Sequence, residues 1–170
     1  MQKYKLVNNI LGWLSFVFGA VVYGLTMESS GSFWDCGEFV SGCLKLQVVH
    51  PPGAPFFLML GRIFTLFASD LSHVAQTVNF LSALSTAGSV MFAFWTVTAL
   101  ARKVIIADGV YTTGRTITVM GAGIIAATCC TFLDSLWFSA VEGEVYALSQ
   151  FFMSFIVWAI MEFCNFKCHQ

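Results

Sequence analysis

Charged residues are scarce in this sequence of 170 residues. Lysine, arginine, aspartate and glutamate together make up 10% of it, whereas about 25% is usual in a soluble domain. Hydrophobic residues make up 58%, among them 18 phenylalanines. So few charges cannot cover a surface that faces water, and we therefore expect an integral membrane protein. The net charge of −1 gives no basis for binding nucleic acid.

The sequence also lacks the motifs of several enzyme classes. It contains no nucleotide-binding glycine loop, no Ser-His-Asp pattern and no internal repeat. Its 6 cysteines do not have the spacing of a disulfide scaffold. Cys164, Cys168 and His169 could bind a metal ion, but a simple helix end is the favoured interpretation.

Four segments are long enough to cross a bilayer, which takes roughly 20 residues. They lie at about 9–26, 78–101, 116–138 and 146–163. We predict an all-α, polytopic membrane helix bundle with these four spans and an outer loop over residues 27–77. The first span follows Lys3 and Lys5 and is interpreted as uncleaved, because no signal-peptide cleavage site closes it.

A fifth apolar run, at residues 54–68, is shorter and carries Arg62. If it does not span, the cytoplasmic side carries the basic residues of the N-terminus and of the 102–115 loop, together with Lys167. This distribution satisfies the positive-inside rule. If it spans, the 102–115 loop moves outside and breaks that rule. We therefore predict a helix in the outer interface. The sequence has 3 prolines, Pro51, Pro52 and Pro55, and they fix its start.

Two carboxylates, Asp35 and Glu38, stand out in FWDCGEFVSGCLKLQVVHPPGAP at residues 33–55. They share one face if a helix begins near Ser32. That face could hold a divalent metal ion or supply a general base. The alternative is that Ser32 and Asp35 only cap a short helix. Burial against the bilayer should raise the pKa of a carboxyl group at this place.

A second acidic pair, Glu142 and Glu144, precedes the last span. On a helix the two would point to different faces. We expect Glu144 to face a site shared with Asp35, and Glu142 to face headgroups or to cap the span. Asp134 either lines the same cavity or sits at interface depth, and the second interpretation is favoured.

The 27–77 loop offers few groups that could bind a phosphate. His50 could contact a phosphate or an acceptor, although a lone histidine beside prolines is more often structural. Among the cations of this loop, Arg62 is the candidate for donating hydrogen bonds to a lipid phosphate. Lys45 is expected to reach the headgroups by snorkelling.

These motifs resemble the GT-C superfamily of membrane glycosyltransferases, which take a sugar from a polyprenyl-phosphate carrier on the extracytoplasmic side. The motifs are WDCGEF at 34–39, HPPGAP at 50–55 and EVYAL at 144–148. Within the superfamily, they resemble a bacterial, Bacteroidota-type family with a domain of unknown function, related to the transmembrane protein O-mannosyltransferases. The resemblance covers nearly the whole chain. It implies the N-terminal part of a larger enzyme, inactive as a fragment. That enzyme would lie in the bacterial inner membrane, with a cytoplasmic N-terminus and a periplasmic active site.

The resemblance implies transfer of a hexose such as mannose from the lipid-linked donor to Ser/Thr hydroxyls of exported proteins. Asp35 is then the first candidate for the catalytic base and Glu38 the second. Glu144, His50 and Arg62 are the candidate substrate-binding residues. A divalent metal ion is possible at the site but not required. The alternatives are a transporter or lipid-sugar flippase that uses the carboxylates as ion or substrate sites, and a purely structural membrane subunit.

Overall fold

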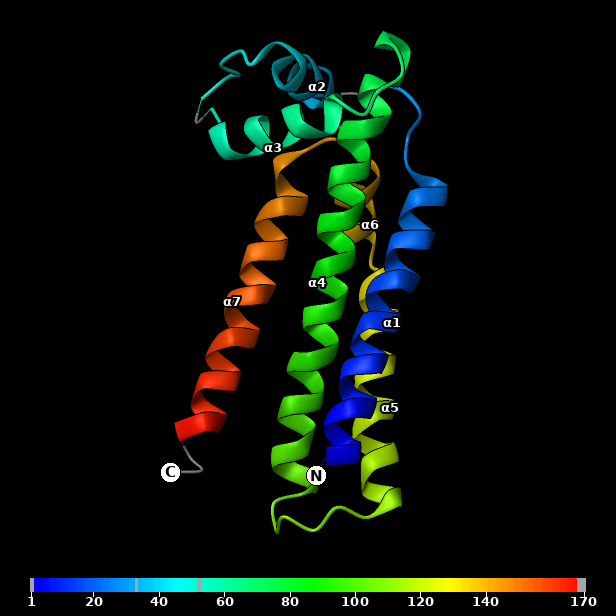
Figure 1. Ribbon diagram of the computed structural model, residues 1–170, viewed down its shortest axis with the longest axis vertical. Helices are drawn as coiled ribbons and strands as arrows, with labels where there is room; N and C mark the ends of the chain where they lie inside the picture. The colour runs from blue at the N-terminus through cyan, green and yellow to red at the C-terminus, as the bar shows by residue number, and fades with distance from the viewer. Residues whose placement is uncertain (1, 33, 52, 168–170) are drawn as a thin grey trace.

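The computed structural model describes residues 2–32, 34–51 and 53–167. Every regular element in these residues is a helix, which confirms the all-α prediction (Figure 1). The α-helices are α1 (Gln2–Thr26), α2 (Cys36–Lys45), α3 (Pro55–Thr65), α4 (Val74–Ile105), α5 (Thr113–Thr131), α6 (Asp134–Val141) and α7 (Val145–Lys167). A short 3₁₀ helix, η1 (Leu71–His73), leads directly into α4.

Four long helices, α1, α4, α5 and α7, run side by side along the long axis of the molecule (Figure 1). Three segments are long and apolar enough to cross a membrane: α1, η1 with α4, and α7. The predicted span over 116–138 differs in detail, because it consists of α5 and α6 with a bend of 60° between them. Leu133 has an extended backbone at this bend, and Asp134 begins α6, where an acidic side chain interacts favourably with the helix dipole.

The central helix of the bundle is α4, and every other helical element that the structure describes packs against it. Small residues let the neighbouring helices approach closely. Gly88 has no room for a side chain, since an added Cβ would lie 2.6 Å from the ring of Phe151 in α7. Gly123 of α5 meets α4 in the same way, with an added Cβ 2.5 Å from Thr98 and 2.8 Å from Phe94.

The apolar run at 54–68 does not run alongside the long helices. It forms α3, which lies with α2 across the end of the bundle where α1 ends and α4 and α7 begin (Figure 1). One face of α3 buries Phe57 and Leu58, while Phe56, Met59 and Ile63 remain exposed. Such a helix, apolar on both faces at the end of a membrane bundle, suits an interfacial position.

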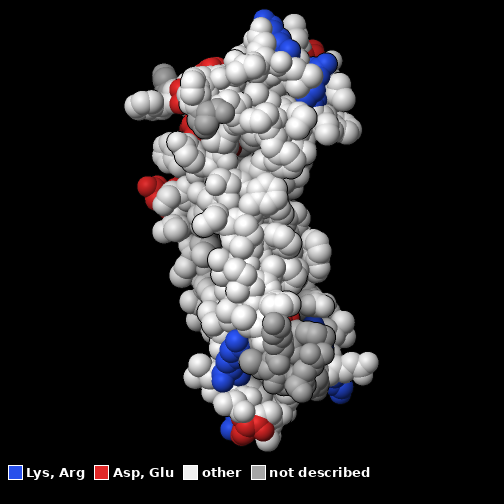
Figure 2. All heavy atoms as spheres, turned by 90° about the vertical axis from the view of Figure 1, so that its left-hand side faces the viewer, with Lys and Arg blue, Asp and Glu red and all other residues white. Residues whose placement is uncertain are grey.

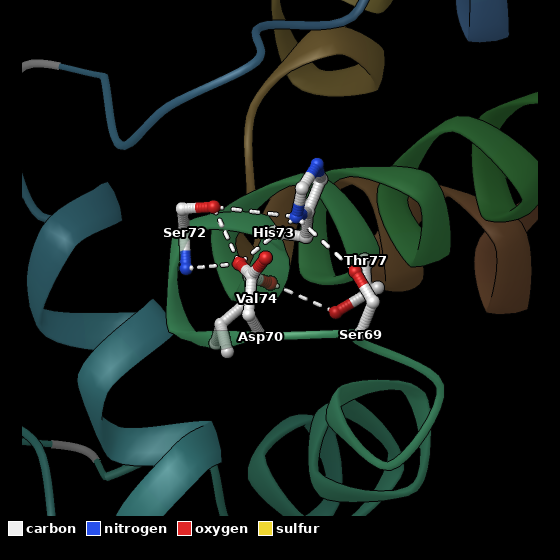
Figure 3. A network of polar contacts seen from close by, with 6 residues as sticks. All are labelled: Ser69, Asp70, Ser72, His73, Val74 and Thr77. Carbon is white, nitrogen blue, oxygen red and sulfur yellow. Dashed lines mark hydrogen bonds and ion pairs between the residues drawn. The ribbon is translucent and has the colours of Figure 1, made fainter.

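The start of α4 is held by a compact polar network (Figure 3). The Asp70 carboxylate accepts hydrogen bonds from the Ser72 backbone N–H at 2.8 Å and from the Ser72 hydroxyl, and it contacts Nδ1 of His73 at 2.9 Å. These bonds lower the pKa of Asp70 to about 2, the Ser72 hydroxyl contributing most. They stop the 3₁₀ turn from fraying and so fix where α4 begins.

Charges gather toward the two ends of the molecule, and the middle of the face drawn in Figure 2 is free of them. The first turns of α1, the last turn of α4 and the first turn of α5 place Lys3, Lys5, Arg102, Lys103 and Arg115 at the end opposite to α2 and α3. An uncharged band between two charged ends is the pattern of a membrane-spanning bundle.

The close approach of α5 to α4 gives a test of this packing. Gly123→Ala should lower the free energy of unfolding by about 1–3 kcal/mol, because the new methyl group overpacks the contact with Thr98 and Phe94. Gly121→Ala is the matched control in the same helix, since an added Cβ there meets nothing within 4 Å. Unfolding of the detergent-solubilised protein by denaturant measures both. Equal stability of the two variants would contradict the packing described here.

Candidate functional site

The centre of the candidate site is a contact between Glu38 and His50. Glu38 lies in the first turn of α2, and its two carboxylate oxygens accept the backbone N–H of His50 at 2.7 Å and face its ring Nδ1 at 2.8 Å. The turn after His50 is closed by a hydrogen bond from the Gly53 N–H to the His50 carbonyl at 2.9 Å. Phe39 packs edge-on against the imidazole with 5.8 Å between ring centroids. The segment between α2 and His50 therefore returns the chain to the start of α2.

Asp35 completes a cluster with this pair. It directly precedes α2, and its Oδ2 lies 3.7 Å from Nε2 of His50. One ligand atom from each of Asp35, Glu38 and His50 lies within 4.8 Å of the others. We call these three residues the acid–histidine cluster. An ionised carboxylate only accepts hydrogen bonds, so Nδ1 of His50 carries its proton toward Glu38 and Nε2 is left facing Asp35.

The cluster shifts the ionisation of its members. The hydrogen bonds from the His50 ring and backbone hold the pKa of Glu38 below its usual range. The same Glu38 contact raises the pKa of His50, and the charge of Asp35 adds to the effect. The expectation that burial raises the carboxyl pKa here is therefore wrong for Glu38. The Glu38 side chain is 44% exposed, so desolvation raises its pKa only slightly, and the hydrogen bonds lower that pKa by more.

Capping does not account for Asp35 and Ser32. Asp35 occupies the N-cap position of α2 but makes no side-chain capping hydrogen bond. Ser32 donates its hydroxyl to Oε1 of Glu142 at 2.7 Å instead. The backbone before Asp35 is strained, because Trp34 has a φ of 64° and is 93% exposed. Left-handed conformations of such residues cost on the order of 1–3 kcal/mol and concentrate at functional sites.

The second acidic pair lies at the same end of the bundle, in the loop between α6 and α7. Glu142 accepts the Ser32 hydrogen bond, which ties this loop to the segment that leads into α2. Glu144 is half-buried, and burial raises its pKa, with further contributions from the charges of Glu142 and Asp35. Of these three causes the charge of Asp35 contributes least, so Glu144 is only weakly coupled to the acid–histidine cluster.

Two positioning residues were not anticipated from the sequence. Asn79 is fully buried near the start of α4 and donates to the carbonyls of Glu28 at 2.8 Å and Ser30 at 3.3 Å. Gly143 lets the 142–144 loop lie on Asn79, because an added Cβ would come within 2.9 Å of its side-chain oxygen. Two features of the sequence could have indicated them: Asn79 is an asparagine within an apolar helix, and Gly143 lies between two glutamates.

The remaining candidates lie apart from the cluster. Arg62 donates from Nη1 to the Leu44 carbonyl at 2.7 Å, at the end of α2 opposite to Asp35, and to Thr65 at 3.4 Å. Lys45 lies in the last turn of α2. Asp134 is exposed at the start of α6. The possible metal motif at the C-terminus cannot be placed, because Cys168 and His169 lie outside the described residues.

The acid–histidine cluster could hold a divalent cation through one oxygen of each carboxylate and one ring nitrogen. These are donor types that divalent transition metals accept. Glu38 and Nδ1 of His50 already satisfy each other, however. The atoms left to meet a ligand are therefore Oδ2 of Asp35, which can accept a proton, and Nε2 of His50, which can donate to a phosphate oxygen when the imidazole is protonated.

Long apolar helices with an acid–histidine cluster at one end define an integral membrane protein with a candidate site near the membrane surface. Residues 35–169 match the family described as the Protein O-mannosyl-transferase TMEM260 N-terminal domain. The match covers most of the chain, which belongs to this family. The matched range includes the acid–histidine cluster, Arg62 and Glu144.

Two relatives carry the name of that family. Protein O-mannosyl-transferase tmem260 of Dictyostelium discoideum is 25% identical over 146 residues, which cover 85% of this chain and 16% of the relative. Protein O-mannosyl-transferase TMEM260 of Mus musculus is 29% identical over 149 residues, which cover 87% of this chain and 19% of the relative. The chain thus spans less than a fifth of the length of these relatives. No solved structure matches it. Both relatives are eukaryotic. The bacterial origin that we expect for this chain stays a prediction.

The Glu38–His50 contact predicts how the imidazole titrates. His50 should titrate above its ordinary value of 6.5, and Glu38→Gln should lower its pKa toward that value, because the carboxylate no longer stabilises the imidazolium. NMR titration of the ring protons, with His50→Gln to assign the signal, measures both. Glu28→Gln, an exposed acid at the same end of the bundle, is the control. An unchanged His50 pKa in Glu38→Gln would show that the contact does not form in solution.

Proposed function

We propose that this chain forms part of the active site of a membrane glycosyltransferase that moves a sugar, such as mannose, from a polyprenyl-phosphate donor to Ser/Thr hydroxyls of exported proteins. The observation that carries the proposal is the convergence of Asp35, Glu38 and His50 within 4.8 Å. Glu144 lies within reach of the field of Asp35 at the same end. The relatives named as protein O-mannosyl-transferases support the reaction class.

In this proposal Asp35 is the general base. Its carboxylate is 56% exposed and can meet an acceptor hydroxyl. As the acceptor oxygen forms its bond to the anomeric carbon, the bond from that carbon to the phosphate oxygen breaks. The hydroxyl proton passes to Asp35, and the bonding electrons leave with the lipid phosphate. A positioned general base of this kind contributes roughly 10²–10⁴-fold to the rate.

His50 and Glu38 act together in the proposed reaction. Glu38 favours the protonated imidazole, so His50 can offer a positive Nε2–H to the departing phosphate, where negative charge develops. Glu144 shapes the electrostatics of the same site. Arg62 supports it indirectly, because its contact with the Leu44 carbonyl holds the far end of α2.

The surroundings of His50 support a lipid-linked donor. A hollow of about 350 Å³ lies beside the His-Pro-Pro-Gly turn, and its lining includes Leu46, Val48, Pro55 and Met59. Val48 is 91% exposed, which is unfavourable in water but suits contact with an isoprenoid chain. The sugar phosphate would then lie next to the cluster while its lipid rests against α3.

We further propose that the cluster faces the extracytoplasmic side. The basic residues Lys3, Lys5, Arg102, Lys103 and Arg115 belong to the opposite end of the bundle. The positive-inside rule assigns that end to the cytoplasm. The acceptor would accordingly be a protein that has already crossed the membrane.

A transporter is the rival proposal. Transport sites usually lie near the membrane midplane at broken helices. The break between α5 and α6 carries Asp134, which is exposed and apart from the cluster. The grouping of Asp35, Glu38 and His50 beyond the ends of the long helices favours the transferase.

Replacement of the proposed base tests this function. In the complete protein, Asp35→Asn should lower transfer by at least about 10²-fold while insertion and abundance stay normal, because only the proton acceptor is lost. Glycosylation of an exported acceptor, followed by mass spectrometry with a defined lipid-phosphate sugar, gives the readout. Glu28→Gln should retain wild-type transfer. Transfer by Asp35→Asn at the rate of this control would rule out Asp35 as the base.

A further inference from the structure

A polar crevice lies at the end of the bundle opposite to the acid–histidine cluster. Its volume is about 410 Å³, within the range of about 300–1,000 Å³ that is usual for ligand pockets. Residues from the beginning of α1, the last turns of α4 and the last turns of α7 line it. Since α1 and α7 both pack on α4, the crevice opens between them with α4 as its floor.

Three tryptophans, one from each helix, form the wall that leads toward the membrane interior. Trp95 of α4 meets Trp13 of α1 with 6.2 Å between ring centroids and Trp158 of α7 with 5.5 Å. The indole N–H of Trp95 donates to the Asn8 carbonyl at 3.2 Å. Gly12 makes this approach possible, because the Trp95 ring fills the place of a side chain there. Tryptophans gather at headgroup depth in membrane proteins, which places the crevice at the membrane surface.

Charges of both signs face this crevice. Lys5 and Arg102 supply two cations, and Glu162 supplies one carboxylate. Among the side chains that the structure describes, which exclude those of residues 165–167, none makes a hydrogen bond or an ion pair with any of these three. The side-chain oxygen of Asn8, which also lines the crevice, is buried and has no hydrogen-bond partner among the described residues. A buried acceptor without a donor is unfavourable, and a ligand with an N–H or O–H group would satisfy it.

We propose that the crevice binds the headgroup of a zwitterionic phospholipid that carries a primary amine, such as phosphatidylethanolamine. Lys5 and Arg102 bind the phosphate through charge-assisted hydrogen bonds. The ammonium group donates to Glu162 and to the free oxygen of Asn8. The indole rings beside it favour a cation by cation–π attraction.

The unpaired acceptors select among headgroups. A primary ammonium has three N–H donors, as a lysine does, and can satisfy both Glu162 and Asn8. A choline headgroup has no N–H donor, so it leaves both oxygens unpaired. Phosphatidylglycerol has hydroxyl donors, but it carries no positive charge for Glu162 or for the indole rings. The crevice therefore prefers phosphoethanolamine over phosphocholine, which lacks a donor.

Native mass spectrometry of the intact, detergent-solubilised protein tests this preference. The protein is offered equal amounts of phosphatidylethanolamine, phosphatidylcholine and phosphatidylglycerol with identical acyl chains. The wild type should retain phosphatidylethanolamine at least several-fold over phosphatidylcholine. Glu162→Gln should abolish that preference, and Arg102→Gln should weaken retention of all three lipids. Lys103→Gln is the matched control, because Lys103 is the next residue along α4 but does not line the crevice.

Three results would overturn the proposal. Equal retention of the ethanolamine and choline lipids by the wild type would do so, as would an unchanged preference in Glu162→Gln. Binding of soluble glycerophosphoethanolamine without retention of the lipid would instead assign the crevice to a free metabolite. If Glu162→Gln unfolds at a lower temperature than the Lys103→Gln control, Asn8→Ala replaces it and should likewise lose the preference.

Discussion

The organisation of this protein depends on α4, which is the most buried of the candidate membrane-spanning helices that the structure describes. Each of the other helical elements described packs against it. A helix that is hydrophobic all round is stable only when it is enclosed by protein or lipid, and here α1, α5 and α7 enclose it. The polar network at Asp70 fixes where α4 begins, and the buried Asn79 anchors the segment that enters α2. The place of the candidate site thus follows from the position of one helix.

The two ends of the bundle have different chemistry. One carries the acid–histidine cluster, in which Glu38 holds His50 by its backbone and its ring and leaves Asp35 beside the free ring nitrogen. Three non-glycine residues in this region, Trp34, Leu46 and Ala54, have positive φ angles. The surrounding structure offsets the energetic cost of this local strain, and such strained residues cluster at functional sites. The other end combines cations with tryptophans, which suits contact with phospholipid headgroups.

Composition and charge predicted the all-α bundle, the non-spanning run at 54–68 and the two acidic pairs at one end. These features depend on properties that add up along the chain, namely hydropathy and the distribution of lysine and arginine. Individual contacts could not be predicted in this way. The Glu38–His50 contact needs the segment after α2 to return to the first turn of that helix, and Arg62 meets the Leu44 carbonyl only after α2 and α3 pack together. The bend before Asp134 was missed because the apolar pattern continues through it.

The proposed mechanism requires that Glu38 and His50 act as one unit in sugar transfer, and a double-mutant cycle tests this requirement. Transfer rates would be measured for Glu38→Gln, His50→Gln and the double variant of the complete protein with one lipid-phosphate sugar donor. We expect strong non-additivity: the double variant should be little slower than the slower single variant, because Glu38 acts through the imidazole that His50→Gln removes. A double variant whose loss equals the product of the two single losses would contradict it, because the two residues would then act independently.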